Sequence, residues 1–310
     1  MTHSRLKGTY CTYTTFSILL ISVMFIVTVF LSFIVLNHDQ CQSQSIAAKP
    51  TVLLGRNPKF AQSRHHLAVL VPYRDRFEEL MEFVPYMFRY LSNQNIDHNI
   101  FILNQIDKYR FNRASLLNAG FQLTKSNHDY IAMHDVDLLP MNTNLSYAYP
   151  ETPVHLAGPS FHPRYHYEKF IGGILLINRE HFQLVDGLSN RYWGWGLEDD
   201  EFYVRLKDAH LNVTRPQNIA TGTSDTFRHI HGADRKRDTV KCYNQREVTR
   251  RRDRKTGLHD VKFDVESYKN MEIEGAPFTV INIRLYCNFT STPWCDCSQQ
   301  KTVSNKKPNR

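Results

Sequence analysis

The sequence contains no internal repeat, and it lacks the two C-x-x-C pairs that are typical of structural zinc sites, so zinc binding is disfavoured. It also has fewer acidic than basic residues, 30 against 38, which gives a net charge of +8. That balance alone would suit nucleic acid, a membrane surface or an anionic small substrate. Hydrophobic residues make up 42% of the 310 residues, enough for a sizeable core and too many for global disorder.

Charged residues are absent from Phe16–Leu36, a stretch long enough to cross a bilayer as a helix. A cleaved signal peptide would have a shorter apolar stretch and a small-residue cleavage site, and neither is obvious here. Arg5 and Lys7 precede the stretch, and the cationic side of a membrane span stays in the cytosol. We therefore predict a cytosolic tail (1–15), a transmembrane signal-anchor (16–36) and a luminal C-terminal part.

Sequons and cysteines agree with a luminal location. N-x-S/T sequons matter only in a secretory compartment, and disulfides form in an oxidising one. A basic, anchored protein of the lumen is a poor candidate for nucleic-acid binding, so no nucleic-acid partner is expected. The sequons lie at Asn144, Asn212 and Asn288. Among the four cysteines of the last quarter we favour Cys287–Cys295 and Cys242–Cys297, and the sequence leaves other pairings open.

Hydrophobic periodicity predicts the order strand–helix–strand–helix–strand in a luminal domain at 64–298, between a polar stem (37–63) and a polar tail (299–310). Such alternation indicates a parallel sheet covered by helices, whose ligands bind beyond the carboxyl ends of the strands. The motifs PYRDR, FNR and HDVD lie at or near those ends. The predicted strands are 67–71, 99–105, about 130–133 and IGGILLIN, and the predicted helices are about 80–91, 111–126 and 201–210.

Two aspartates, Asp135 and Asp137, follow the third predicted strand. Because they are two residues apart, their side chains point the same way in extended chain, and no cation neighbours them in sequence. A divalent cation would relieve their repulsion, and such oxygen ligands suit Mg²⁺ or Mn²⁺ bound to a diphosphate. The alternative is a chance acid-x-acid triplet.

Two histidines in RHIHGADRKRD, His229 and His231, have the same spacing. They would bind one metal ion from one face, or they are an ordinary surface pair. Imidazole nitrogen together with carboxylate oxygen shifts the preferred ion from Mg²⁺ towards Mn²⁺. Arg237 would neutralise phosphates, although most of the basic run 235–255 fits a solvated stretch of charge.

The segment WGWGLEDDEF places four consecutive acids, 198–201, after two Trp-Gly pairs, with no cation beside them. One interpretation is the acidic first turn of a helix. The other is a catalytic carboxylate beside an aromatic platform for a sugar, since Trp193 and Trp195 offer flat faces and carboxylates accept bonds from hydroxyls. Two tryptophans between glycines and next to acids favour a binding loop.

Taken together, these motifs resemble the β-1,4-galactosyltransferase family. The matching stretches in chain order are PYRDR, FNRASLLN, HDVDLLP, FIGGILLIN, WGWGLEDDEF and FRHIHGADRKRD, and they span about residues 67–297. The HxH pair, PRYHYEKF and TPWC further resemble the branch of the family that adds galactose to the xylose of the proteoglycan linker. The resemblance implies a GT-A type nucleotide-sugar transferase fold, a Rossmann-like mixed sheet with flanking helices, behind the transmembrane helix.

The resemblance also implies an inverting transfer of galactose from UDP-galactose to O4 of xylose on a proteoglycan core protein. It implies Mn²⁺ as cofactor and a single-pass type II protein of the Golgi membrane, with its catalytic domain in the lumen. By motif, Asp199 would be the general base, and Asp137, His229 and His231 the metal ligands. Gly-rich and charged loops, 193–196 and part of 232–257, would close over the donor.

Two further sets of residues follow from the same motifs. The acceptor would contact Tyr165, Tyr167, Trp195, Glu198, Asp199 and Asp200. The donor would contact Pro72, Tyr73, Arg74, Asp75, Arg76, Phe111, Asn112, Arg113, Asp135, Val136, Asp137, Tyr165, Trp195, His231 and Arg237.

Two residues depart from the family pattern. Phe170 stands where a tyrosine is common, which would relax discrimination between galactose and N-acetylgalactosamine donors. Leu197 replaces the usual Gly or Arg, which would alter acceptor affinity. Two alternatives stay open. The first is an N-acetylgalactosaminyltransferase or a galactosyltransferase acting on N-acetylglucosamine, and the HxH pair, Tyr165 and Tyr167 argue against it. The second is a non-catalytic lectin or glycosaminoglycan-binding protein that uses the basic run.

Overall fold

A computed structural model describes Met24 and residues 64–232, 235–298 and 300. The predicted tail, span and stem (1–63) therefore lie, apart from Met24, outside the described residues, as does most of the polar tail beyond residue 298. Among the helices that are described, none is both long and apolar enough to cross a membrane. The membrane span thus stays a prediction from the sequence.

A seven-stranded mixed sheet forms the centre of the domain, with the strand order β5-β6-β3-β1-β2-β9-β8. The central strand β1 pairs in parallel with β2 and β3, and β2 pairs in parallel with β9. The outer pairings β3–β6, β5–β6 and β8–β9 are antiparallel. The mixed α/β class is therefore confirmed. The strands are β1 Leu67–Tyr73, β2 His98–Gln105, β3 Tyr130–His134, β5 Val154–His155, β6 Ile174–Asn178, β8 Phe263–Ile273 and β9 Ala276–Leu285.

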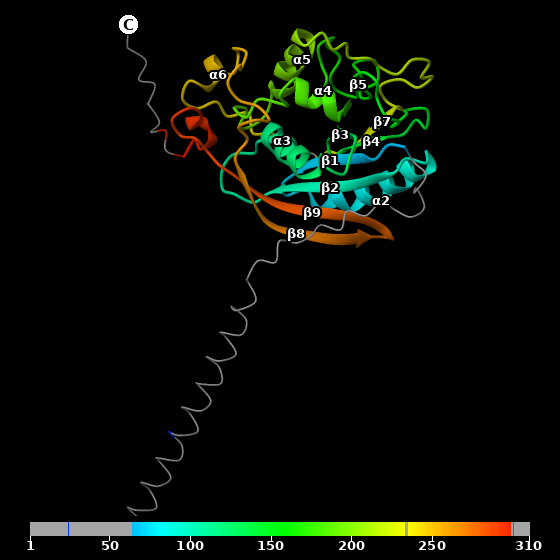
Figure 1. Ribbon diagram of the computed structural model, residues 1–310, viewed down its shortest axis with the longest axis horizontal. Coiled ribbons are helices and arrows are strands. Elements are labelled where there is room, and N and C mark those ends of the chain that lie inside the picture. Colours follow the sequence, from blue (N-terminus) through cyan, green and yellow to red (C-terminus); the bar gives the residue numbers. More distant parts are fainter. Residues whose placement is uncertain (1–23, 25–63, 233–234, 299, 301–310) are drawn as a thin grey trace, which may run out of the picture. The chain divides into compact units, whose positions relative to one another are not determined.

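Helices cover both faces of this sheet, because alternate residues of each strand point to opposite sides. Ala68 and Leu70 of β1 belong to the hydrophobic cluster that α3 shares, whereas Val69 and Val71 belong to the cluster that α2 shares. Figure 1 shows α2 and α3 on opposite sides of the strands. The helices are α2 Phe77–Asn93, α3 Arg113–Thr124, α4 Arg179–Leu184, α5 Glu198–Asp208 and α6 Gln245–Val248, with a 3₁₀ turn at Pro293–Cys295.

The long hairpin β8–β9 is an element that the sequence analysis did not predict. Its strands are joined by Glu274 and Gly275, which both have positive φ angles, 50° and 77°. Positive φ at two successive residues is the geometry of a tight two-residue hairpin turn. The hairpin adds β9 to the buried part of the sheet and leaves β8 at the edge.

Two disulfides fix the C-terminal segment, and both are the pairs favoured from the sequence. Cys242–Cys297 joins this segment to the loop before α6, and Cys287–Cys295 closes a short loop within the segment. Trp294 directly precedes Cys295 and is fully buried. Its indole Nε1 donates to the carbonyl of Arg191 at 2.8 Å, and its own carbonyl accepts from Arg110 Nη1 at 3.1 Å. The C-terminal segment is thereby fixed to the loops that border the candidate site.

Candidate active site

A cavity of about 710 Å³ lies at the carboxyl ends of β1 and β3, where several motifs of the sequence meet. Since these two strands are parallel neighbours, the segments that follow them, 72–76 and 135–137, emerge at the same edge. Strand β6 runs antiparallel to β3, so the residues before it reach that edge too, and Asp135 N–H donates to the carbonyl of Gly173 at 2.9 Å.

Eighteen of the twenty residues predicted for catalysis, metal, donor or acceptor line this cavity; Tyr73 and Asn112 are the exceptions. Those that line it are Pro72, Arg74, Asp75, Arg76, Phe111, Arg113, Asp135, Val136, Asp137, Tyr165, Tyr167, Trp195, Glu198, Asp199, Asp200, His229, His231 and Arg237.

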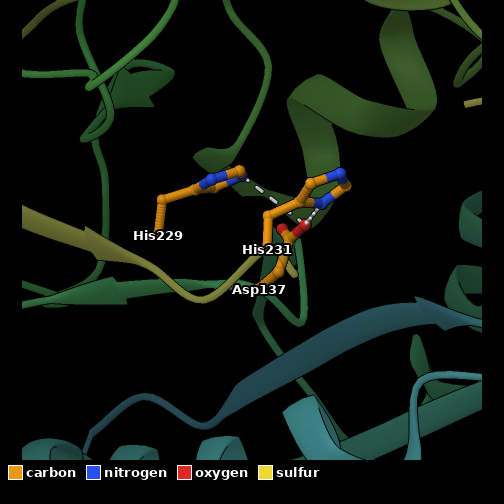
Figure 2. A group of neighbouring side chains, drawn as sticks. All are labelled: Asp137, His229 and His231. Atoms are coloured by element: carbon orange, nitrogen blue, oxygen red, sulfur yellow. Dashed lines mark hydrogen bonds and ion pairs between the residues drawn. The ribbon is translucent and has the colours of Figure 1, made fainter. Parts of the chain in front are cut away.

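Asp137, His229 and His231 form a three-residue cluster whose ligand atoms all lie within 4.8 Å of one another. A short antiparallel pair, β4 (Leu138–Pro140) with β7 (Phe227–His229), brings them together (Figure 2). Asp137 Oδ2 lies 3.0 Å from His231 Nδ1 and 3.5 Å from His229 Nε2, and the two imidazole rings are stacked with centroids 5.2 Å apart.

The hydrogen bonds of His231 indicate what this cluster is built to hold. Its Nε2 lies 3.0 Å from the carbonyl of Arg235, to which it donates, so the lone pair of Nδ1 faces the Asp137 carboxylate. Two lone pairs facing each other at 3.0 Å repel unless a proton or a cation lies between them. The donor set of one carboxylate oxygen and two imidazole nitrogens fits a borderline divalent ion such as Mn²⁺.

The second aspartate, Asp135, has a different partner from the one expected. The sequence suggested that both aspartates lack a cation and would share a metal ion. In the structure Arg113, the first residue of α3, donates from Nε to Asp135 Oδ1 at 2.9 Å. Burial works to lower the pKa of Arg113, but Asp135, Glu198 and Asp199 outweigh it and raise this pKa. One largely buried cation therefore serves three carboxylates of the cavity.

The acidic run is itself the first turn of α5, which begins at Glu198 rather than at about residue 201 as predicted. The helix dipole favours negative charge in this turn, so both interpretations of the run hold together. Glu201 points away from the cavity and makes a buried ion pair with Arg205 at 2.9 Å. Glu198, Asp199 and Asp200 remain on the cavity wall.

Asp199 has the electrostatics of a general base. The pKa of Asp199 is raised from 3.8 to about 7, mainly by burial and next by the neighbouring Glu198, while Arg113 opposes the rise. Burial raises the pKa of Glu198 as well. A base is most effective when its pKa lies near the working pH. The site is also tight, because a Cβ added at Gly172 would lie 2.5 Å from Asp199 Oδ2.

Aromatic residues form another part of the cavity wall. The guanidinium of Arg237 lies 4.9 Å from the ring of Trp195 and 5.5 Å from that of Tyr165. Trp195 and Tyr167 are 44% and 45% exposed, so their faces are available to a ligand. Trp193 is only 3% exposed and packs in the core, so the idea that both tryptophans form the binding loop is wrong for Trp193.

Three residues that the sequence analysis missed hold this loop in place. The N–H of Trp195 donates to the carbonyl of Asp238 at 2.8 Å, and Lys241 Nζ donates to the carbonyl of Trp195 at 3.1 Å. Arg110 clamps the Asp238 carboxylate with bonds of 2.6 and 2.9 Å. Segments 193–196 and 235–241 therefore act as one bonded unit over the cavity.

Some residues predicted to bind the donor are occupied by structural bonds. Asn112 is fully buried, and its Oδ1 accepts from Ser115 N–H at 2.9 Å, so it caps α3 and does not border the cavity. Tyr73 is likewise absent from the lining. Arg74 borders the cavity, but its three donor nitrogens are bonded to the carbonyls of Gln105, Asp107 and Tyr109. The bonds of Asn112 and Arg74 therefore fix the backbone around the cavity.

The chain is similar to known protein families, sequences and solved structures. A family model for the N-terminal region of glycosyl transferase group 7 matches residues 31–150, and one described as the N-terminal domain of galactosyltransferase matches residues 152–230. The chain is 61% identical over 239 residues to β-1,4-galactosyltransferase 7 of Drosophila melanogaster, covering 76% of this chain and 74% of that one. It is 50% identical over 239 residues to the xylosylprotein 4-β-galactosyltransferase of Caenorhabditis elegans, covering 75% and 83%.

A solved structure is similar over the same region. A crystal structure of a mutant Drosophila β-1,4-galactosyltransferase 7 in complex with manganese, UDP-galactose and xylobiose has a TM-score of 0.75 and 60% sequence identity. The match covers 76% of this chain and all of that chain.

Proposed function

The chain belongs to the β-1,4-galactosyltransferase family, and from this premise we propose that it is a xylosylprotein 4-β-galactosyltransferase. It transfers galactose from UDP-galactose, with inversion, to O4 of xylose on a proteoglycan core protein, and so builds the glycosaminoglycan linker region. The observation that carries the proposal is the single cavity that holds both the Asp137–His229–His231 cluster and the Asp199 carboxylate. The ligands of the Drosophila complex, a nucleotide sugar and a xylose disaccharide, support the same donor and acceptor.

Mn²⁺ would be held by Asp137, His229 and His231. The 3.0 Å approach of His231 Nδ1 to Asp137 Oδ2 supports this assignment, as does the mixed oxygen and nitrogen donor set. When bound, such an ion supplies positive charge that stabilises the negative charge on the departing UDP. Burial lowers the pKa of His229, which keeps this imidazole neutral and its lone pair free.

The donor lies against the segments that follow β1 and β3. The nucleotide would be surrounded by Pro72, Arg74, Asp75, Arg76, Phe111, Arg113 and Val136, although Arg74 acts through the loop that its guanidinium fixes. Arg237 would neutralise the diphosphate, because its guanidinium is held over the cavity by two aromatic rings. Tyr165 supports a ligand contact, since its buried hydroxyl has no partner among the described residues.

The acceptor xylose would lie between the aromatic residues and the first turn of α5. Trp195 and Tyr167 offer exposed faces for the apolar side of the sugar, and Glu198 and Asp200 accept bonds from its hydroxyls. Asp199 takes the proton from O4 as this oxygen attacks the anomeric carbon of galactose on the face opposite UDP. A positioned base contributes about 10²–10⁴-fold to the rate.

The compartment follows from the sequence rather than from the described residues. We infer a single-pass type II protein of the Golgi membrane, with its catalytic domain (64–298) in the lumen. The two disulfides support an oxidising compartment. The three sequon asparagines, Asn144, Asn212 and Asn288, are all exposed, which suits glycan attachment.

A substrate panel tests the proposal directly. The full chain, purified in detergent, is incubated with Mn²⁺ and either UDP-galactose or UDP-N-acetylgalactosamine, and with a β-xyloside or N-acetylglucosamine as acceptor. We expect product from UDP-galactose and the xyloside. Product with N-acetylglucosamine but not with the xyloside would contradict the acceptor assignment. Sugar binding without any product would instead support a lectin.

A further inference from the structure

His162 is a buried residue of the cavity wall to which the proposed mechanism gives no task. It is 3% exposed. Its Nδ1 accepts two backbone N–H bonds, from Arg164 at 2.9 Å and from Tyr165 at 3.1 Å. A ring nitrogen that accepts cannot carry the proton, so the neutral imidazole carries it on Nε2.

The Nε2–H of His162 has no acceptor within the part of the chain that the structure describes. The rest of the ring is enclosed. It packs on Phe170 and Tyr165, with centroids 4.9 and 5.0 Å away, and its Cδ2 would lie 3.6 Å from a Cβ added at Gly173. His162 forms part of the cavity wall, and its Nε2 is not among the fully buried side-chain atoms without a partner, so this N–H is open to the cavity and can bond something that enters it.

The position of His162 indicates which part of a ligand its Nε2–H would bond. On one side it lies within the electrostatic reach of Asp135 and His229, next to the metal cluster that would hold the diphosphate. On the other side it packs on Phe170, and Phe170 and Asp199 both border Gly172, at 2.7 and 2.5 Å from a Cβ added there. His162 thus lines the cavity near both the metal cluster and the base, and in a glycosyl transfer the group between the diphosphate and the base is the transferred sugar.

We propose that the Nε2–H of His162 donates a hydrogen bond to an oxygen of the transferred sugar, which makes His162 a specificity-determining residue for the donor. The inference rests on the proposed function, since it takes galactose as the group transferred. A neutral donor suits a neutral sugar hydroxyl, whereas the charged Arg237 is better suited to phosphate. A site that bonds a hydroxyl rejects analogues that lack it, because the bound analogue covers the donor and leaves it unpaired. Burial, the main cause, lowers the pKa of His162 to about 4, so it stays neutral near pH 7.

Two substitutions separate the functions of the two ring nitrogens. In His162→Asn the amide oxygen takes the place of Nδ1 and can still accept from Arg164 and Tyr165, but the Nε2–H is lost. In His162→Gln the amide nitrogen takes the place of Nε2 and can still donate, but the acceptor of the turn is lost. The pair is matched, since both variants are neutral amides.

The measurement is the affinity of the full chain for UDP-galactose and for UDP, by calorimetry with Mn²⁺. We expect His162→Asn to bind UDP-galactose on the order of tenfold more weakly than wild type and UDP equally well. His162→Gln should retain the preference for UDP-galactose over UDP. Unchanged affinity of His162→Asn for UDP-galactose would overturn the inference, and so would an equal loss for UDP and UDP-galactose.

A second measurement on the wild-type protein keeps the inference testable even where the variants fail to fold. UDP-galactose analogues, each with one galactose hydroxyl replaced by hydrogen, are compared for affinity. At least one should bind about tenfold more weakly. If none does, the inference is wrong. These are binding measurements, so a wild-type protein that binds UDP-galactose but transfers it to no xyloside would refute the proposed function without deciding the role of His162.

Discussion

The raised pKa of Asp199 predicts an acid limb in the pH dependence of galactosyl transfer. An ordinary aspartate with a pKa of 3.8 would be fully ionised at every pH above about 6, and the rate would not depend on its protonation there. Burial, and next the charge of Glu198, raises this pKa to about 7. A base with that pKa is about nine-tenths ionised at pH 8 and about one-tenth at pH 6, so kcat/KM should fall about tenfold between them.

The assay follows initial rates with UDP-galactose and a fluorescent β-xyloside at saturating Mn²⁺, from about pH 5.5 to 8.5. Glu198→Gln provides the perturbation. Because this substitution removes the second cause of the raised pKa, we expect the acid limb to move to lower pH, whatever the absolute rate of the variant.

Protonation of the metal ligands is the competing explanation of an acid limb. UDP affinity in Mn²⁺, measured over the same pH range, is the control, because loss of the metal would weaken UDP binding. A flat rate between pH 6 and 8, or a limb that follows UDP affinity and does not move in Glu198→Gln, would refute the reasoning about Asp199.

Three other substitutions test separate parts of the site. Asp199→Asn should raise the melting temperature at pH 8 but not at pH 4. The pKa of Asp199 is about 7 in the folded state and 3.8 in the unfolded state, so its ionisation destabilises the fold by up to about 4 kcal/mol, in full above pH 7 and not at all below pH 3.8. Equal melting temperatures of variant and wild type at pH 8 would contradict this. His231→Ala should weaken Mn²⁺ and UDP binding together, and unchanged UDP affinity in Mn²⁺ would show that the metal assignment is wrong. Gly172→Ala should lower kcat by at least about tenfold while the circular dichroism spectrum stays native, because the new Cβ would lie 2.5 Å from Asp199 Oδ2 and push this oxygen out of place. A wild-type kcat would contradict the contact.

The central strands and helices could be predicted because their pattern is local. The apolar runs of β1, β2 and β3 and the helical spacing of α2 and α3 are visible within short windows of sequence. Strands β4 and β7 have three residues each, too few to show a period, yet they bring Asp137 to His229. The hairpin β8–β9 had a usable signal, Glu274–Gly275 between two strand-like runs, and the sequence analysis overlooked it.

The residues of the site could be predicted by type and motif, but their partners could not. Arg113 lies 22 positions before Asp135, and Arg110 lies 128 before Asp238, so the ion pairs depend on the folded chain. For that reason the acids of the site seemed to lack a cation. Trp193 and Trp195 occur in identical Trp-Gly pairs, and only the fold shows that one packs in the core and the other faces the cavity.

The role of Asn112 had a local signal that the motif concealed. An asparagine three residues before Ser115 at the start of a helical pattern is a common N-cap, and the structure shows that cap. Its place within FNR suggested contact with the donor instead. A residue within a functional motif can thus serve the site by fixing a helix rather than by touching a ligand.

The most direct test of the central claim is the formation of a galactose–xylose disaccharide by the full chain and by Asp199→Asn, each with Mn²⁺ and with EDTA. We expect product at the full rate only from the wild-type chain with Mn²⁺, while Asp199→Asn still binds UDP in Mn²⁺ and loses about 10²–10⁴-fold in rate. Turnover by Asp199→Asn at the wild-type rate, or product in EDTA, would contradict a mechanism that needs both the Asp199 base and the Asp137–His229–His231 cluster.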